Sequence, residues 1–517
     1  MTPGRSVASS SRPLSRAPSE QGLTGAVRDL LGDTGAMGAT VRQIASRLRD
    51  RPDRVAQALK ELRDHGDVLR MGRGLFVRRD FERLLDRDDF VDPAAFVERF
   101  EKENGVALGR YSGPITFRSN ESVPVHRWWP YVQGFSAEFV SGVLEDAALP
   151  RGATVLDPFA GSGTTLVEAR RTGARAVGTE LLAPAVLAAR VKTRFELEAR
   201  SLATAAERVL RRAQRQPPGV PPFLRETGRQ FSPEALRDLT RIRDVLPPEG
   251  TDLSDALRLA FGRILIPSSR LHRSPCLGYG KRLDDDPVSP FERFRSAVNE
   301  MGDDLTDLAP ERSRWGPPAR VELRDARDGA WPKRSVALAV TSPPYVNGMD
   351  YVMNYKVDLA WLGYASSYAD LRAVRRDQVA CDNLPRAETE RYRDTSAVAD
   401  PWLREILNRI RENLARKETY RRDDVHAVVH RYFSDLAPVL DGIYRALVPG
   451  GRFVVVVGDS LLAGAYVPGD LLLARLGAAR GFSIVSVEVA RRRRSGQRRS
   501  FELRESIVTL ERPRSAG

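Results

Sequence analysis

Cysteine is nearly absent from this chain, with Cys276 and Cys381 the two thiols in 517 residues. Two thiols cannot build a disulfide scaffold or a zinc site of four cysteines, so both classes are excluded. We expect a reducing, cytoplasmic setting. The longest apolar run, around Phe453–Val457, is far shorter than the roughly 20 residues that cross a bilayer, so we expect a soluble protein without a membrane partner. The first 20 residues lack the apolar core of a secretory signal and are rich in Ser, Pro and Arg, which predicts a disordered tail over 1–20.

Lysine is scarce as well: it occurs at seven positions, although Lys and Arg together number 82 against 68 Asp and Glu. The basic side chains are therefore almost all arginine. Arginine suits phosphate through its planar, bidentate fork, but an Arg-rich genome produces the same bias. The net charge of +14 and the pI near 10.0 favour a polyanionic partner. At roughly 100–200 residues per domain, the length allows two to four domains.

Residues 21–80 predict a small helical unit that ends in a basic hairpin. Apolar residues recur at helical spacing in three stretches, and two short apolar strands then flank the Gly72–Gly74 turn. This order resembles a winged helix-turn-helix domain. Such a domain would bring positive charge to a duplex backbone on the second helix of the pair and in the hairpin, through Arg54, Lys60 and Arg73. Docking to another protein is the alternative use of such a module.

From residue 153 onward, apolar strands alternate with helices, as in an open parallel sheet of the α/β class. We expect residues 81–195 to hold a linker and the first part of this core, and residues 313–515 to hold the second part. The stretch between them, 196–312, predicts a helix-rich insertion. A second insertion is expected at about 365–435, and a terminal strand pair is expected to flank Arg491–Arg499.

The strongest local signal is the segment Val155–Thr165, which reads VLDPFAGSGTT. It predicts a strand ending at Asp157, a Gly-rich turn, and a helix opening at Thr164. Gly161 and Gly163 permit positive φ and a close approach of ligand to backbone, while the turn amides and the helix N-terminus favour an anionic group. Neither the GxGxxG spacing nor a Walker GK[ST] is present.

Two carboxylates accompany this turn and suggest its ligand. Asp157 at the strand tip suits an amine-bearing ligand. Glu180, twenty-three residues later, ends the next predicted strand, where a carboxylate can accept from both hydroxyls of a ribose. S-adenosylmethionine, an amino acid joined to a nucleoside, satisfies both features.

The second signal is Thr341-Ser-Pro-Pro-Tyr345 at the end of a predicted strand. Two prolines remove two N–H donors, so the Ser342 side chain and the Pro343 carbonyl, with Pro344 following, face outward as acceptors. Acceptors without competing donors suit an exocyclic amino group, because hydrogen-bonding its N–H groups directs its lone pair toward an electrophile. Tyr345 would supply a flat face on which a base extruded from the helix can stack.

Together these two motifs resemble the amino-DNA methyltransferases, which methylate adenine N6 or cytosine N4. The resemblance covers about half the chain, and it implies a Rossmann-like class I methyltransferase fold, S-adenosylmethionine as cofactor and no metal. It assigns catalysis to Ser342, Pro343, Pro344 and Tyr345. The cofactor-binding residues that it implies are Phe135, Ser136, Asp157, Pro158, Phe159, Gly161, Gly163, Thr164, Glu180 and Asp325, the last near the adenine amine of the cofactor.

Base choice depends on small differences. A Ser at the first motif position resembles the cytosine-N4 group, whereas Asp would resemble the adenine-N6 group, so the sequence favours cytosine N4 and leaves adenine N6 open. C5-cytosine chemistry is disfavoured because the Pro343-Pro344 pair is not followed by the cysteine that a covalent adduct requires. The motif order, cofactor turn first, is often reversed in members with so complete a Gly turn, which leaves the subclass open.

The resemblance implies double-stranded DNA as partner and a cytoplasmic, nucleoid-associated location. Restriction–modification, phage defence with partner proteins, and an orphan modification system all fit. An RNA base methyltransferase and a winged-helix regulator with a degenerate methyltransferase fold are the alternatives, and the sequence does not indicate monomer or dimer. The first insertion is the expected target-recognition region. Further phosphate contacts are predicted in its basic loop and at the C-terminal hairpin tip: Arg270, Arg273 and Arg492.

Overall fold

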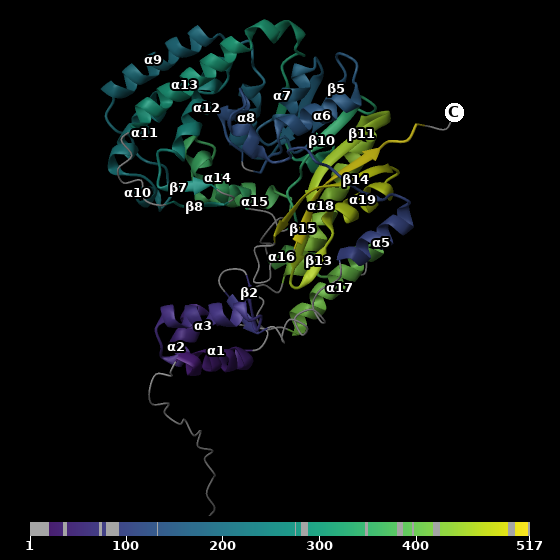
Figure 1. Ribbon diagram of the computed structural model, residues 1–517. Coiled ribbons are helices and arrows are strands. Elements are labelled where there is room, and N and C mark those ends of the chain that lie inside the picture. The colour runs from purple at the N-terminus through teal and green to yellow at the C-terminus, as the bar shows by residue number, and fades with distance from the viewer. Residues whose placement is uncertain are drawn as a thin grey trace, which may run out of the picture. The chain divides into compact units, whose positions relative to one another are not determined.

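The computed structural model divides the chain into two units, which are described separately (Figure 1). Unit 1 comprises Met1–Val91 and Arg493–Glu502, and unit 2 comprises Asp92–Arg492 and Leu503–Gly517. The residues that the structure describes are 20–34, 39–71, 75–78, 93–131, 133–273, 276–280, 288–346, 350–379, 386–394, 398–416, 424–494 and 502–514.

The described residues of unit 1 form three helices and a small antiparallel sheet. The helices are α1 (Glu20–Thr34), α2 (Val41–Leu48) and α3 (Pro52–Asp64), and the strands are β1 (Ala39–Thr40), β2 (Val68–Met71) and β3 (Leu75–Arg78), in the order β1-β3-β2. Thr40 caps α2 through a capping box, in which its hydroxyl accepts from the Gln43 amide and the Gln43 side chain accepts from the Thr40 amide. The elements follow the predicted order. The winged helix-turn-helix assignment and its DNA contact stay predictions.

Unit 2 is built on an eight-stranded sheet with the order β4-β14-β15-β11-β10-β5-β6-β9. The pairs β11·β10, β10·β5, β5·β6 and β6·β9 are parallel, whereas β15 runs antiparallel to β11. The predicted α/β architecture is therefore present, with one strand reversed near its edge. The strands are β4 (Leu108–Arg110), β5 (Thr154–Asp157), β6 (Arg175–Glu180), β9 (Arg320–Leu323), β10 (Val336–Thr341), β11 (Leu447–Gly458), β14 (Ser483–Arg494) and β15 (Glu502–Glu511).

Helices from several of the strand connections cover this sheet. α7 packs on β5 and β6, α8 packs on β6 and β9, and both α18 and α19 pack on β11. The core between them consists of aliphatic side chains such as Val155, Leu166, Leu338 and Val454. The helices are α5 (Pro93–Asn104), α6 (Ala137–Ala147), α7 (Thr164–Arg171), α8 (Ala183–Lys192), α18 (Val425–Ala446) and α19 (Gly469–Ala478).

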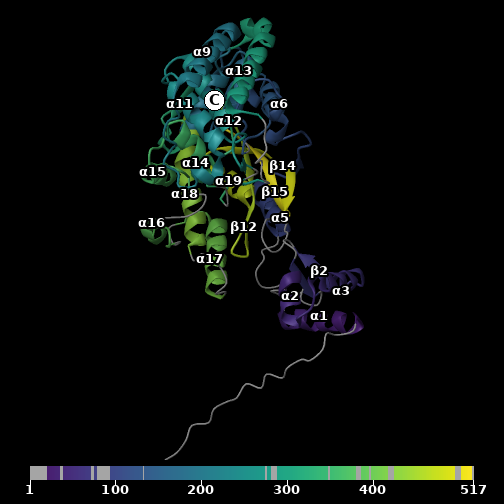
Figure 2. The same ribbon diagram turned by 90° about the vertical axis from the view of Figure 1, so that its left-hand side faces the viewer.

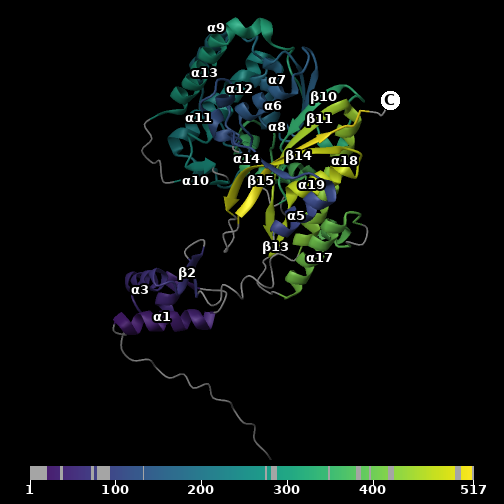
Figure 3. The same ribbon diagram turned by 45° about the vertical axis from the view of Figure 1, so that its right-hand side comes forward.

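The segment predicted as the first insertion folds into a helical layer beside the sheet (Figures 2 and 3). Its helices share one apolar core with the end of α8, in which Phe231, Phe261 and Phe294 are fully buried. The elements are α9 (Ala199–Arg215), α10 (Thr227–Gln230), α11 (Pro233–Val245), α12 (Asp252–Leu265), β7 (Leu271–Arg273), β8 (Leu277–Tyr279) and α13 (Pro290–Asp307).

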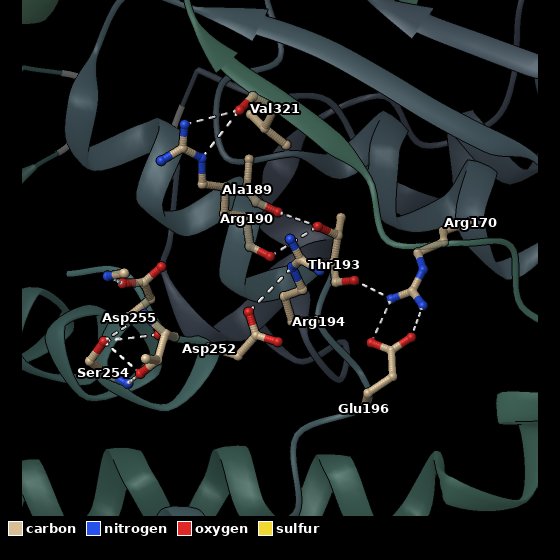
Figure 4. A network of polar contacts seen from close by, with 12 residues as sticks. Arg170, Ala189, Arg190, Thr193, Arg194, Glu196, Asp252, Ser254, Asp255 and Val321 are labelled. Carbon is tan, nitrogen blue, oxygen red and sulfur yellow. Dashed lines mark hydrogen bonds and ion pairs between the residues drawn. The ribbon is translucent and has the colours of Figure 1, made fainter.

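A buried arginine ties the two ends of this insertion to the sheet domain. Arg170, near the end of α7, donates to the carbonyls of Gly316 at 2.8 Å and Pro317 at 3.0 Å, just before β9. Its other nitrogens bind the Thr193 carbonyl and the Glu196 carboxylate, just after α8 (Figure 4). Because one guanidinium satisfies acceptors on both connections, the insertion leaves and rejoins the sheet at one point.

Four further helices come after the predicted catalytic loop Ser342–Tyr345 in the chain. They are α14 (Tyr351–Trp361), α15 (Tyr368–Asp377), α16 (Arg386–Arg391) and α17 (Pro401–Arg416), and a hairpin of β12 (Ser460–Leu462) and β13 (Ala465–Val467) follows β11. In the described part of the chain, no helix combines the length and hydropathy needed to cross a membrane. Across those same residues, His, Cys, Asp and Glu side chains nowhere gather in threes that could hold a metal ion.

Candidate functional site

The site lies where the chain changes direction in the sheet. After β5 the chain adds β6 and β9 on one side, whereas β10 lies on the other side of β5. Such a switch point opens a crevice at the carboxyl ends of the strands, and ligands of α/β proteins bind there. The two strand ends are joined directly, because the Thr341 hydroxyl at the end of β10 donates to Asp157 Oδ1 at the end of β5, at 2.6 Å.

The Gly-rich turn adopts the backbone that the sequence predicts. Gly161 and Gly163 have φ of +50° and +87°, in the left-handed region that favours glycine. A Cβ on Gly163 would meet the Cα and Cβ atoms of Ala189 at 2.9 Å, so glycine here also allows α7 and α8 to pack closely. A Cβ on Gly161 would meet the ring of Tyr131 at 2.9 Å.

Glu180, at the end of the neighbouring strand β6, binds the backbone of the Gly-rich turn. Its Oε2 accepts from the Gly161 amide at 2.9 Å, and its Oε1 accepts from the Leu181 and Leu182 amides, both at 2.8 Å. Burial raises the pKa of Glu180, and these amide hydrogen bonds oppose the rise. The carboxylate thus fixes the turn and lines the cavity at the same time.

The loop Ser342–Tyr345 leaves β10 beside this turn. Ser342 and Pro344 line the same cavity as the Gly-rich turn, whereas Pro343 is buried. The Tyr345 hydroxyl donates to Glu505 Oε1 at 2.6 Å, and Glu505 is also bound by Arg491. The ring of Tyr345 is half-buried and lies outside the cavity lining.

The two motifs therefore meet in one cavity, which encloses about 790 Å³ of space including its open mouth. Its lining comes from the carboxyl ends of four neighbouring strands, β10, β5, β6 and β9, and from three further segments: 131–135, Tyr351 and 378–379. The residues are Tyr131, Gln133, Gly134, Phe135, Asp157, Pro158, Phe159, Ala160, Gly161, Ser162, Thr164, Glu180, Leu181, Leu182, Arg324, Ala326, Ser342, Pro344, Tyr351, Gln378 and Val379.

Asp157 is a buried titratable group in the lining of this cavity. Its side chain is 1% exposed, and burial raises its pKa to about 6 despite hydrogen bonds from Thr341, Thr165 and the Phe159 amide. A carboxyl group with this pKa is half ionised near pH 6. A cationic ligand would stabilise its ionised form.

Some predicted cofactor residues have other partners. Ser136 is fully buried and caps α6: its hydroxyl accepts from the Phe139 amide at 3.0 Å and donates to the Pro114 carbonyl at 2.7 Å. Asp325 caps the short helix Ala326–Asp328, and its carboxylate binds the Arg327 guanidinium at 2.6–3.0 Å. Neither side chain lines the cavity, although Phe135, Arg324 and Ala326 beside them do.

Arg273 was predicted to contact phosphate, but its side chain is nearly buried and paired within the protein. Its side chain is 9% exposed and pairs with buried Asp358, and its guanidinium lies 4.1 Å from the ring centroid of Tyr355. Tyr355 stacks on Tyr131, which lines the cavity, with ring centroids 5.4 Å apart. Arg273 therefore supports the cavity wall, because the aromatic stack and the ion pair compensate for burying its charge.

The other residues that were predicted to contact phosphate belong to different elements of the chain. Arg54 on α3 pairs with Asp50 at 3.3 Å, and Lys60 on the same helix is exposed. Arg73 lies outside the described residues. Arg270 donates to the Arg229 carbonyl at 3.2 Å, and Arg492 is exposed on β14. Their contact with DNA stays a prediction.

Several lining residues were not predicted from the sequence. Tyr131 and Gln133 lie just before Phe135, which was predicted to bind the cofactor, so the aromatic residue Tyr131 beside it was a usable signal. Arg324 follows β9 directly. Gln378 and Val379 come from the second insertion, and no local pattern there marks them.

The comparisons with known proteins agree with this site. Residues 130–189 match a family model described as DNA methylase, a range that includes Gly134, the Gly-rich turn and Glu180. The chain is 24% identical over 450 residues to the Type II methyltransferase M.BsoBI of Geobacillus stearothermophilus, covering 77% of this chain and 88% of that protein. It is 23% identical over 407 residues to the Type II methyltransferase M.AvaI of Nostoc sp., covering 72% and 82%.

Among solved structures, TrmN from Thermus thermophilus aligns at 13% identity over 73% of this chain and 48% of that chain, with a TM-score of 0.25, too low to carry an argument. The sequence matches provide the support, and the range matched by the family model includes the part of the cavity lining between Tyr131 and Leu182. The predicted resemblance of this chain to the amino-DNA methyltransferases is therefore confirmed.

Proposed function

We propose that this protein transfers a methyl group from S-adenosylmethionine to the exocyclic amine of a base flipped out of double-stranded DNA, with cytosine N4 preferred over adenine N6. One observation carries the proposal: the Gly-rich turn, Glu180 and the loop at Ser342 line a single cavity at the switch point of the sheet. A methyl donor and its acceptor must meet within one site for transfer to occur.

The residues present fit the proposed cofactor. Asp157 suits the cationic amino group, because its buried carboxylate gains a counter-charge there. Glu180 suits a ribose hydroxyl, since its Oε2 accepts from one amide and keeps a further lone pair, whereas its Oε1 accepts from two amides. The apolar lining by Phe135, Phe159 and Leu182 suits the adenine ring. When bound, the cofactor supplies an electrophilic methyl group on a sulfonium centre.

The loop Ser342–Tyr345 would orient the acceptor amine. The Ser342 hydroxyl and the Pro343 carbonyl accept hydrogen bonds from the two N–H groups, which holds the nitrogen lone pair toward the methyl carbon. Transfer forms the N–C bond and breaks the S–C bond, and the amine then loses one proton. Extruding the base costs stacking energy, and a face such as the ring of Tyr345 compensates for part of it.

The preference for cytosine N4 rests on the residue before the two prolines. Ser342 is neutral, and its hydroxyl can both accept and donate. A Ser at this position resembles the cytosine-N4 group, whereas Asp would resemble the adenine-N6 group. Cytosine and adenine both present an exocyclic amine donor beside a ring-nitrogen acceptor, so adenine N6 stays the second candidate.

Transfer of label tests the substrate class. Purified protein and methyl-tritiated S-adenosylmethionine are incubated in two parallel reactions, one with unmethylated plasmid DNA and one with bulk transfer RNA. We expect label in the DNA, with incorporation that falls steeply as salt rises because phosphate contacts release counterions. Label in the RNA alone would contradict the proposal, as would no label in either.

Asp157 predicts a pH dependence of cofactor-product binding. The ionised carboxylate favours the cationic amine, and burial sets its pKa at about 6 in the free protein. Ionisation rises from about a tenth at pH 5 to about nine-tenths at pH 7, so affinity for S-adenosylhomocysteine should rise about tenfold over that range. Isothermal titration calorimetry measures this affinity directly.

Two controls separate Asp157 from other titrating groups. Asp157→Asn keeps an acceptor for Thr341 but does not ionise, so its affinity should not change over the same range. Adenosine lacks the amino acid, and its binding to the wild-type protein should also stay constant. An unchanged tenfold rise in the Asn variant would assign the titration elsewhere.

A further inference from the structure

The cofactor cavity has a wall that comes from outside the Gly-rich turn and the Ser342–Tyr345 loop. Gln378 and Val379 line it directly after α15, together with Arg324 and Ala326 at the carboxyl end of β9. The segment 376–379 thus reaches the cavity from the second insertion. On the opposite side, Ser342 and Pro344 line the cavity at the end of β10. Since β5 and β6 lie between β10 and β9, segment 376–379 lies at the end farthest from the proposed methyl acceptor.

Two arginines hold this segment by its main chain. Arg327 donates to the Asp377 carbonyl, and Arg431 on α18 donates to the carbonyls of Arg376 at 3.2 Å and Gln378 at 3.4 Å. Both guanidinium groups also pair with Asp435 on α18, at 3.1 Å and 3.3 Å. One buried carboxylate therefore orients both arginines, which in turn position segment 376–379.

Arg327 of this network also binds the carboxylate of Asp325. Its two carboxylate oxygens accept from Arg327 Nε at 3.0 and 2.9 Å, and from Arg327 Nη2 at 2.6 Å. A carboxylate held in this bidentate pair is not placed to accept from the adenine amine of a cofactor, and it does not line the cavity. Another group must then recognise the base at this end.

We infer that Gln378 recognises the adenine of the bound cofactor, accepting from its 6-amino group and donating to a neighbouring ring nitrogen. The inference rests on the proposed function. If Glu180 holds the ribose, the base extends past β6 toward β9, where Gln378 lies. A carboxamide offers one acceptor beside one donor, the pattern that pairs with an adenine edge. Among the described residues, the hydrogen bonds of Gln378 run through its main chain, and none uses its carboxamide.

The test compares two ligands that differ at one group. Affinities are measured by calorimetry for S-adenosylhomocysteine and for its counterpart with hydrogen in place of the 6-amino group. We expect the wild-type protein to prefer the amino ligand by about tenfold, the value of one to two neutral hydrogen bonds. In Gln378→Ala the ratio should fall to near one, while affinity for the 6-hydrogen ligand stays within about twofold.

The outcomes distinguish this inference from the proposed function. If the wild-type protein binds neither ligand, the proposed function fails and the inference fails with it. If the wild-type protein discriminates between the ligands and Gln378→Ala discriminates equally, the inference alone is overturned. A general loss of affinity that leaves the ratio near ten would mean that Gln378 shapes the wall without reading the base.

Asp435 provides a second test through the network that positions Gln378. Asp435→Asn weakens both arginine pairs and should reduce S-adenosylhomocysteine affinity about threefold to tenfold, together with the ligand ratio. Asp441→Asn is the matched control, because Asp441 lies on the same helix and pairs with Arg480 at 3.1 Å. Equal affinities in the two variants would show that the Asp435 pairs do not position the recognising group.

Discussion

Replacing Gly163 with alanine is expected to destabilise unit 2 by about 2–5 kcal/mol and to remove measurable cofactor binding. The left-handed φ of +87° costs a non-glycine residue about 1–2 kcal/mol. The new Cβ would also meet backbone and side-chain atoms of Ala189 at 2.9 Å, and such overpacking costs about 1–3 kcal/mol. Because Ala189 lies on α8, relief of the overlap would separate α7 from α8 and shift the turn that holds the cofactor.

Urea unfolding followed by tryptophan fluorescence measures this change in the right part of the molecule. All six tryptophans lie between residues 92 and 492, so the signal reports unit 2. Gly142→Ala is the matched control: Gly142 lies inside α6, and nothing lies within 4 Å of its added Cβ. Alanine there should stabilise the protein by about 0.5–1 kcal/mol. Equal effects of the two substitutions would contradict the packing that we describe.

Replacing Tyr345 with alanine is expected to reduce kcat/KM for DNA by about 5-fold to 150-fold. This range corresponds to the 1–3 kcal/mol by which one aromatic ring stabilises a stacked base. Affinity for S-adenosylhomocysteine should stay within about twofold, because Tyr345 does not line the cofactor cavity. Methyl transfer to unmethylated plasmid DNA and calorimetry with S-adenosylhomocysteine provide the two measurements.

Tyr345→Phe separates the ring from the hydroxyl. Phenylalanine keeps the stacking face and loses the hydrogen bond to Glu505, so its loss of kcat/KM should be smaller than that of alanine. DNA with an abasic site opposite the target base should restore part of the activity of Tyr345→Ala, since the base then leaves the helix more easily. A phenylalanine variant as impaired as the alanine variant would show that the hydroxyl, not the ring, is required.

The parts of the site that the sequence predicted are those encoded within a few residues. The turn at Gly161 and Gly163 has the expected backbone because only glycine adopts positive φ at low cost. Strand ends at Asp157, Glu180 and Thr341 were predictable since parallel strands place their carboxyl ends at one edge of the sheet. The alternation of strands and helices also predicted the architecture.

The parts that were missed depend on contacts between distant segments. Gln378 reaches the cavity through arginines at 327 and 431, and no periodicity in the second insertion reveals this. Arg273 was predicted as a phosphate contact because of its charge, yet Asp358 and Tyr355 bury it. The pairing of β4 with β14 was also missed, because three residues of an edge strand give little signal. Burial and ion pairing of an arginine cannot be inferred from its local sequence.

Nucleoside mass analysis of the methylated product identifies the atom that receives the methyl group. The turn at Gly161 and the loop at Ser342 line one cavity, in which we propose that an exocyclic amine receives the methyl group. DNA incubated with the protein and S-adenosylmethionine, then digested to nucleosides, should contain N4-methylcytosine or N6-methyladenine. Ring-methylated 5-methylcytosine as the product, or DNA with no added methyl group, would contradict it.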